Sequence, residues 1–240
     1  MFAWLHNIIY IDMSNFFSLK VTSTSAMFAI CLRLESLNLN NFDTSLVTNM
    51  MGMFRYCYLL ESLNLSHFNT SLARNMRQMF DTSFALKSLD ITNFDTKSVT
   101  DMSYMFRSCE SLQSLDINNF NTSSIINMKY MFKECKSLIS LNLTNFDSKN
   151  ITSDMEMFDQ CNQNLKYCID ERKNYFFLSS LSNYEKNCRD ICISFESKKF
   201  IFERNKCIDD CSLDEKYKYE YNNICYEKCP NKLIYEKINV

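Results

Sequence analysis

Apolar residues recur along the first two-thirds of the chain with a spacing of 26 residues. A leucine column, a phenylalanine column and a column of Met-Phe pairs keep this spacing together over six copies. The columns are Ile11, Leu37, Leu63, Leu89, Leu115 and Leu141; Phe16, Phe42, Phe68, Phe94, Phe120 and Phe146; and the pairs that end at Phe28, Phe54, Phe80, Phe106, Phe132 and Phe158. Three columns that stay in phase predict a tandem-repeat protein.

Each repeat has two halves with different apolar spacing. In the clearest copy, residues 88–113, Leu89 and Ile91 alternate with polar residues, which predicts a short, half-buried strand. The apolar residues of the second half follow the i, i+3, i+4, i+7 spacing of a short helix: Met102, Met105, Phe106 and Cys109. Thr100 is the predicted N-cap of this helix, and Asp101 follows at its positive end.

A strand and a short helix cannot bury their apolar faces alone, so the repeats are expected to stack. The predicted fold is an α/β solenoid, a leucine-rich-repeat-like stack of short parallel strands and short helices, followed by a small disulfide-rich module. We expect the solenoid to span residues 1–166, a connector residues 167–187, and the cysteine-rich module residues 188–240.

The cysteine-rich module is predicted from three C-x3-C pairs. They are Cys188 and Cys192, Cys207 and Cys211, and Cys225 and Cys229. So small a segment has too little apolar core to fold without cross-links, which favours disulfides. Zinc is the alternative, but structural zinc sites more often use C-x2-C pairs and no histidine lies here. A bridge from Cys161 to Cys168 is a further candidate, as a closure of the last repeat.

Two columns of polar residues in the repeats, one of asparagine and one of cysteine, are predicted to stabilise the fold. The asparagines before the core phenylalanine are predicted to bond backbone groups of a neighbouring turn: Asn41, Asn93, Asn119 and Asn145. A cysteine column is predicted to hold buried free thiols, with disulfides between turns as the alternative: Cys31, Cys57, Cys109, Cys135 and Cys161.

The repeat motif resembles a known family. The segments SLNLNNFDTSLVTNMMGMFRYC (residues 36–57) and SLDITNFDTKSVTDMSYMFRSC (residues 88–109) are similar to the DUF285-type repeat of BspA-like leucine-rich repeat proteins. The likeness extends over about residues 8–166. It implies a surface protein with a role in adhesion and in the binding of host proteins.

Two surfaces are candidates for ligand binding. The strand face carries a polar column, for which a merely solvated face is the alternative: Asn38, Asn64, Asp90, Asp116 and Asn142. The helical or loop side carries aromatic and cationic residues of the type that anchors interfaces: Arg55, Tyr56, Tyr104, Arg107, Lys129, Tyr130 and Lys133.

Composition excludes other classes of function. The net charge is −2 and no basic stripe occurs, which disfavours nucleic acid as a partner. With one glycine and two histidines, the chain has no phosphate-binding loop and no histidine cluster, so we expect neither enzymatic activity nor a cofactor. No stretch of about 18 apolar residues exists, so no membrane span is expected.

The sequence therefore predicts a non-enzymatic, cell-surface or secreted protein that binds protein or glycan ligands, host molecules included. The paired cysteines favour an oxidising, extracellular compartment. The first residues lack the basic start of a signal peptide, which is expected if the N-terminus is truncated. The alternative is an intracellular interaction scaffold with reduced or zinc-bound cysteines.

Overall fold

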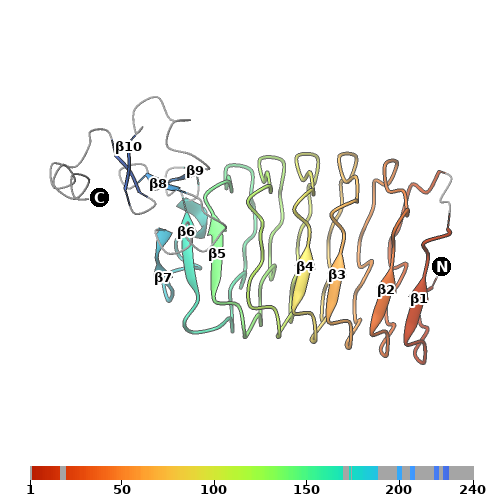
Figure 1. Ribbon diagram of the computed structural model, residues 1–240. Coiled ribbons are helices and arrows are strands. Elements are labelled where there is room, and N and C mark those ends of the chain that lie inside the picture. The colour runs from red at the N-terminus through yellow and green to blue at the C-terminus, as the bar shows by residue number, and fades with distance from the viewer. Residues whose placement is uncertain are drawn as a thin grey trace, which may run out of the picture.

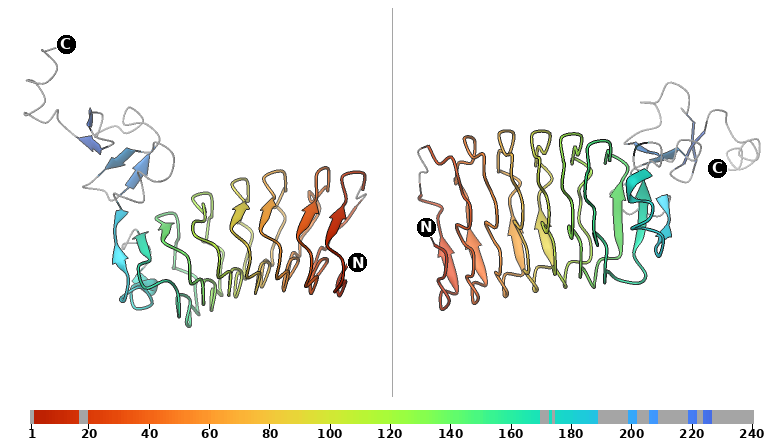
Figure 2. Two further views of the ribbon diagram at one scale, coloured as in Figure 1. Left: turned by 60° about the horizontal axis from the view of Figure 1, so that its bottom comes forward. Right: turned by 180° about the vertical axis from the view of Figure 1, so that it is seen from behind.

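The protein is a parallel β-solenoid, an elongated row of stacked turns (Figures 1 and 2). The computed structural model describes residues 2–16, 20–169, 173, 175–188, 199–201, 206–208, 219–221 and 224–226. One strand line runs along the row: β1 (Tyr10–Asp12), β2 (Ser36–Asn38), β3 (Ser62–Asn64), β4 (Ser88–Asp90), β5 (Ser140–Leu143) and β6 (Lys166–Ile169). Paired strands are parallel and 26 residues apart, as Leu63 and Leu89 are. The predicted solenoid of stacked parallel strands is confirmed.

A second line of parallel bridges runs through the other half of every turn. It joins one residue of each turn to the next: Ser23, Asn49, Asn75, Asp101, Asn127 and Ser153. This line lies in the segments that were predicted to be helical, and that prediction is wrong: residues 101–110 form a bridge and turns, and no helix. Thr100 caps nothing, because its hydroxyl donates to the carbonyl oxygen of Arg74 in the preceding turn at 3.2 Å.

The turn segments alternate between local and inter-turn hydrogen bonds. Phe106 N–H donates to Met131 C=O of the next turn (2.9 Å), whereas Arg107 N–H donates to Tyr104 C=O three residues back (3.2 Å). Tyr104 (φ 61°) and Ser108 (φ 55°) are left-handed, and positive φ recurs every 26 residues at both positions. Two left-handed residues four apart interrupt a right-handed helix, while they leave the apolar spacing of a helix in place.

Asparagine and aspartate side chains form the corners of each turn. In the turn that begins at β4, Asp90, Asp95 and Asp101 each accept the backbone N–H two residues on, at 3.2, 3.0 and 2.8 Å. Such Asx turns reverse the chain without glycine or proline. This explains how a chain with one glycine and one proline makes so many corners.

A buried threonine column joins each turn to the next. The hydroxyl of Thr96 donates to the carbonyl oxygen of Asn121 (2.9 Å) and accepts the N–H of the same residue (2.7 Å). The same donation is made by Thr44, Thr70, Thr122 and Ser148. The threonine that ends the NFDT segment of the repeats, residues 93–96 in the clearest copy, is therefore a structural cross-tie between turns.

Replacing Thr96 with valine tests this cross-tie. Valine keeps the shape but removes both bonds, so we expect the free energy of unfolding to fall by about 2 kcal/mol, because the two backbone groups of Asn121 lose a partner. Urea denaturation measures the change. Thr96→Ser retains the hydroxyl and serves as the control; equal stabilities of the valine and serine variants would contradict the cross-tie.

The core is built from stacked aromatic rings. Adjacent members of the main column lie 5.5 to 5.8 Å apart between ring centroids and are nearly parallel, with interplanar angles of 3° to 10°: Phe28, Phe54, Phe80, Phe106, Phe132 and Phe158. All six rings are buried. The Met-Phe column of the sequence is thus the continuous interior of the solenoid.

The stack continues beyond residue 166, where the sequence predicted its end. β6 pairs with β5 in the 26-residue register, and β7 (Glu185–Lys186) pairs with β6. Between them lies the 3-10 helix η1 (Tyr175–Phe177). A disulfide joins Cys168 to Cys188, so the bridge from Cys161 to Cys168 is wrong; Cys161 is a buried free thiol.

The C-terminal region contains a four-stranded sheet in the order β10-β11-β8-β9. Its strands are β8 (Lys199–Ile201), β9 (Lys206–Ile208), β10 (Tyr219–Tyr221) and β11 (Ile224–Tyr226). Of the predicted disulfide cysteines, Cys207 lies on β9 and Cys225 on β11, while Cys192, Cys211 and Cys229 lie outside the described residues. Within the described part of the chain, no helix has the length and apolar character needed to cross a membrane.

Candidate functional site

The polar column of the strand face takes part in the fold. Each of its members accepts the backbone N–H of the residue two positions on, at 2.9 to 3.2 Å: Asn38, Asn64, Asp90, Asp116 and Asn142. Asn142 is only 4% exposed. These side chains therefore act as corner residues, and their recurrence is explained without a ligand.

The asparagine column before the core phenylalanine bonds the preceding turn. The side-chain amide of Asn93 donates to Ser66 C=O (2.7 Å), that of Asn41 to Ser14 C=O (3.0 Å), and that of Asn119 to Phe94 C=O (2.6 Å). Asn145 donates in the same way to the carbonyl of Asn118. These amide groups tie each turn to the one before it.

The cysteine column of the repeats is buried and carries free thiols. Each thiol lies beside the carbonyl of a core phenylalanine; Cys109 Sγ is 3.3 Å from Phe80 O. In the one repeat without this cysteine, Ser83 Oγ donates to Phe54 O at 3.1 Å. Burial raises the pKa of these thiols, and that of Cys161 to about 12.

The buried thiols predict a loss of stability in alkali. Unfolded thiols ionise near pH 9, whereas the folded thiols keep their protons, so the unfolded state is favoured as pH rises from about 9 towards 12. Each thiol contributes at most about 1.4 kcal/mol per pH unit. Cys109→Ser, which copies Ser83, should make the decline shallower in urea denaturation at pH 8 to 10.5. An unchanged slope would contradict the assignment.

The turn side of repeats two to five carries a continuous aromatic and cationic surface, which we call the Tyr-Arg strip. Its members are Arg55, Tyr56, Arg77, Tyr104, Arg107, Lys129 and Tyr130. All of them are partly exposed. Six of the seven residues predicted on this side belong to the strip, and the seventh, Lys133, has its Nζ 5.3 Å from the Tyr130 ring centroid.

Tyr104 is the centre of the strip. Its ring centroid lies 5.6 Å from Arg77 Cζ, 5.1 Å from Arg107 Cζ and 5.8 Å from Lys129 Nζ. The ring of Tyr130 lies 4.7 Å away. At the other end, Arg55 Cζ stands 4.4 Å from the Tyr56 centroid, and its guanidinium donates to the Tyr56 hydroxyl at 2.7 Å. Cation–π contacts hold these long side chains in place.

A buried carboxylate connects the two halves of the strip. Asp81, whose side chain is 0% exposed, accepts from Arg107 Nε (2.7 Å) and Nη2 (3.1 Å), and it pairs with Arg55 Nε (3.3 Å). Burial acts to lower the pKa of Arg107, but the hydrogen bonds and charge of Asp81 outweigh it and raise that pKa. Asp81 thus fixes two arginines that are 34% and 28% exposed.

Sequence reasoning missed two members of this arrangement, Arg77 and Asp81. Asp81 could have been identified from the sequence, because it lies 26 residues from Arg55 and from Arg107 in the same repeat column, and Arg77 shares the repeat position of Lys129. A buried acid between two bases of one column is the signal that would have identified the ion pair.

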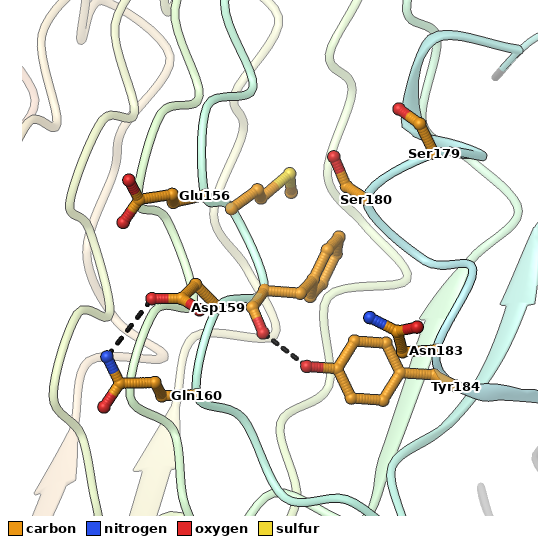
Figure 3. A pocket seen from close by; sticks show the side chains of 9 residues that line it. Glu156, Asp159, Gln160, Ser179, Ser180, Asn183 and Tyr184 are labelled. Carbon is orange, nitrogen blue, oxygen red and sulfur yellow. Dashed lines mark hydrogen bonds between the residues drawn. The ribbon is translucent and has the colours of Figure 1, made fainter.

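An open pocket of about 390 Å³ lies between the last regular repeat and residues 179–184 (Figure 3). Glu156, Asp159, Gln160, Ser179, Ser180, Asn183 and Tyr184 line it. Lys133 pairs with Glu156 and, at 2.9 Å, with Asp159. Hydrogen bonds to these carboxylates raise the pKa of Lys133, and the same ammonium lowers that of Asp159. The acids of the pocket are therefore compensated by a local base.

The fold and its surface define a class, a repeat solenoid with one exposed aromatic and cationic strip. A protein-family model described as "Mycoplasma protein of unknown function, DUF285" matches residues 1–89 and 61–172. The chain belongs to this DUF285 family, as the repeat motif predicted. A search of curated proteins finds no match.

Proposed function

We propose that this protein is a non-enzymatic binding protein, secreted or on the cell surface, that engages a protein or glycan ligand in adhesion through the Tyr-Arg strip. The observation that carries the proposal is the gathering of Arg77, Arg107 and Lys129, from three different turns, around one partly exposed tyrosine, Tyr104. Tyrosine and arginine are the residues most enriched at binding hot spots.

The solenoid supports this role by its shape and its bonding. Stacked repeats present extended surfaces, on which adjacent turns place equivalent residues side by side. The strand-face column is engaged in Asx turns, as at Asp90 and Asp116, whereas the strip is aromatic and charged. The strip is therefore the better candidate surface for a ligand.

The bond between Cys168 and Cys188 supports an extracellular location, because disulfides persist in oxidising compartments. Alkylation of the purified, unfolded chain before and after reduction, read by mass, tests this. More free thiols after reduction are expected. Equal numbers would favour the intracellular scaffold with reduced or zinc-bound cysteines.

Ligand binding is tested with the full chain against a panel of extracellular matrix proteins and host glycans. We expect at least one member to bind saturably. A panel in which nothing binds would contradict the proposed function.

A further inference from the structure

Two cations of the Tyr-Arg strip lack a carboxylate partner within the described ranges of the chain. Among the described residues, Arg55 and Arg107 pair with Asp81, whereas Arg77 and Lys129 form no ion pair. Arg77 Nε is also buried and has no hydrogen-bond partner in the part of the chain that the structure describes. Because the Arg77 side chain is partly exposed, the accessible part of its guanidinium can pair with an incoming anionic group.

The spacing of these two cations suits an extended chain. Arg77 and Lys129 occupy the same repeat position two turns apart, and Tyr104 lies within 6 Å of both. Neighbouring parallel strands are about 4.8 Å apart, so two turns separate the backbones by about 10 Å. In an extended peptide of polyproline II form, which has three residues per turn and a rise of about 3.1 Å per residue, acidic side chains three positions apart lie on one face and about 9 Å apart.

An exposed apolar group continues the strip at its Tyr56 end. The rings of Tyr56 and Tyr58 are 6.0 Å apart, and those of Tyr58 and Phe84 are 5.1 Å apart. Leu59 and Phe84 are 43% and 37% exposed. An anionic glycan has no apolar side chain to cover this group, whereas a protein segment can offer acidic and apolar side chains together.

From this combination we infer that the strip binds an acidic, extended protein segment that carries an apolar or aromatic side chain. The inference rests on the proposed function and names the class of its ligand. Carboxylates of the segment pair with Arg77 and Lys129, and its apolar side chain packs against Phe84 and Tyr58. The chain as a whole has a net charge of −2, so the attraction is local to the strip and specific to it.

Binding of synthetic probes to the full chain tests the inference. The probes are an oligoglutamate peptide with one central phenylalanine, an all-glutamate peptide of equal length, and heparin, each titrated at low salt. The phenylalanine peptide should bind most tightly. Arg77→Ala combined with Lys129→Ala should weaken it about tenfold, because two exposed ion pairs with the peptide are lost. Added salt should weaken it further.

The control is Lys97→Ala combined with Lys149→Ala, which removes the same charge at exposed positions outside the strip. It should leave binding of the phenylalanine peptide within about twofold of the parent. Equal losses in both double variants, no preference for the phenylalanine peptide, or tighter and equally variant-sensitive binding of heparin would each overturn the inference.

The same experiments distinguish failure of the acidic-segment inference from failure of the proposed function. A panel ligand that binds the full chain and is unaffected by the loss of Arg77 and Lys129 would overturn the acidic-segment inference and leave a binding protein. Failure of all probes and all panel members would overturn both.

Discussion

Replacing Phe106 with alanine is expected to lower the free energy of unfolding by about 4 kcal/mol. The ring is fully buried and lies 5.5 Å from both Phe80 and Phe132, so its removal opens a cavity that faces two neighbouring turns. A solenoid transmits this loss, because each turn is stabilised only by the turns beside it. Urea denaturation followed by tyrosine fluorescence measures the change.

Phe84→Ala provides the matched control. The same atoms are removed from a ring that is 37% exposed and whose ring contact is with Tyr58, so the expected loss is below about 1 kcal/mol. If Phe106→Ala does not fold, Phe106→Leu keeps most of the volume and should cost about 1.5 kcal/mol. Equal losses at positions 84 and 106 would contradict the stacked core.

Removing the bond between Cys168 and Cys188 is expected to cost about 3 kcal/mol, the scale for a closed loop of this length. The bond spans 20 residues, and that loop carries the buried Phe177 and Leu181 together with Tyr184, which contacts Phe158 of the last regular turn. Its loss should therefore loosen the cover over the C-terminal end of the stack. Cys168→Ala combined with Cys188→Ala is the variant, and urea denaturation is the measurement.

Hydrogen exchange measurements would locate the loss of stability that follows removal of the disulfide. Amides of β6 and β7 should lose protection in the double variant, while those around Phe80 and Phe106 should keep it. Cys135→Ala, at a buried thiol without a bridge, is the control for the loss of a cysteine side chain. Unchanged exchange at β7 would show that the disulfide does not hold the cover in place.

The period of 26 residues was sufficient to predict the stack and its register. Leu63 faces Leu89 as equivalent positions of adjacent turns must. The helices were wrong for a physical reason: Met102, Met105, Phe106 and Cys109 keep helical spacing although the backbone is left-handed at Tyr104 and Ser108. The residue types at the left-handed positions rarely indicate a positive φ. In the column that contains Tyr104, only Gly52 is a residue that favours this conformation.

The candidate site was predictable in part. Tyr56, Tyr104 and Arg107 stood out by residue type, because aromatic and cationic groups on a repeat surface suggest binding. The role of Asp90 was not predictable from the sequence. The same carboxylate can accept a hydrogen bond from the backbone N–H two residues on, which forms an Asx turn, or from a ligand, and the residue type does not distinguish the two. Asp81 was missed because a buried ion pair becomes evident only when the columns are compared.

We propose that the Tyr-Arg strip binds the ligand, whereas the strand face forms the corners of the turns. The most direct measurement is the affinity of the full chain for a captured panel ligand in two double variants, Arg77→Ala with Lys129→Ala and Asp90→Asn with Asp116→Asn. Asparagine already forms the same corner at Asn64, so the second variant should stay folded. We expect the affinity to fall at least about fivefold in the first variant, which corresponds to about 1 kcal/mol, and to stay unchanged in the second. The reverse result would contradict this proposal.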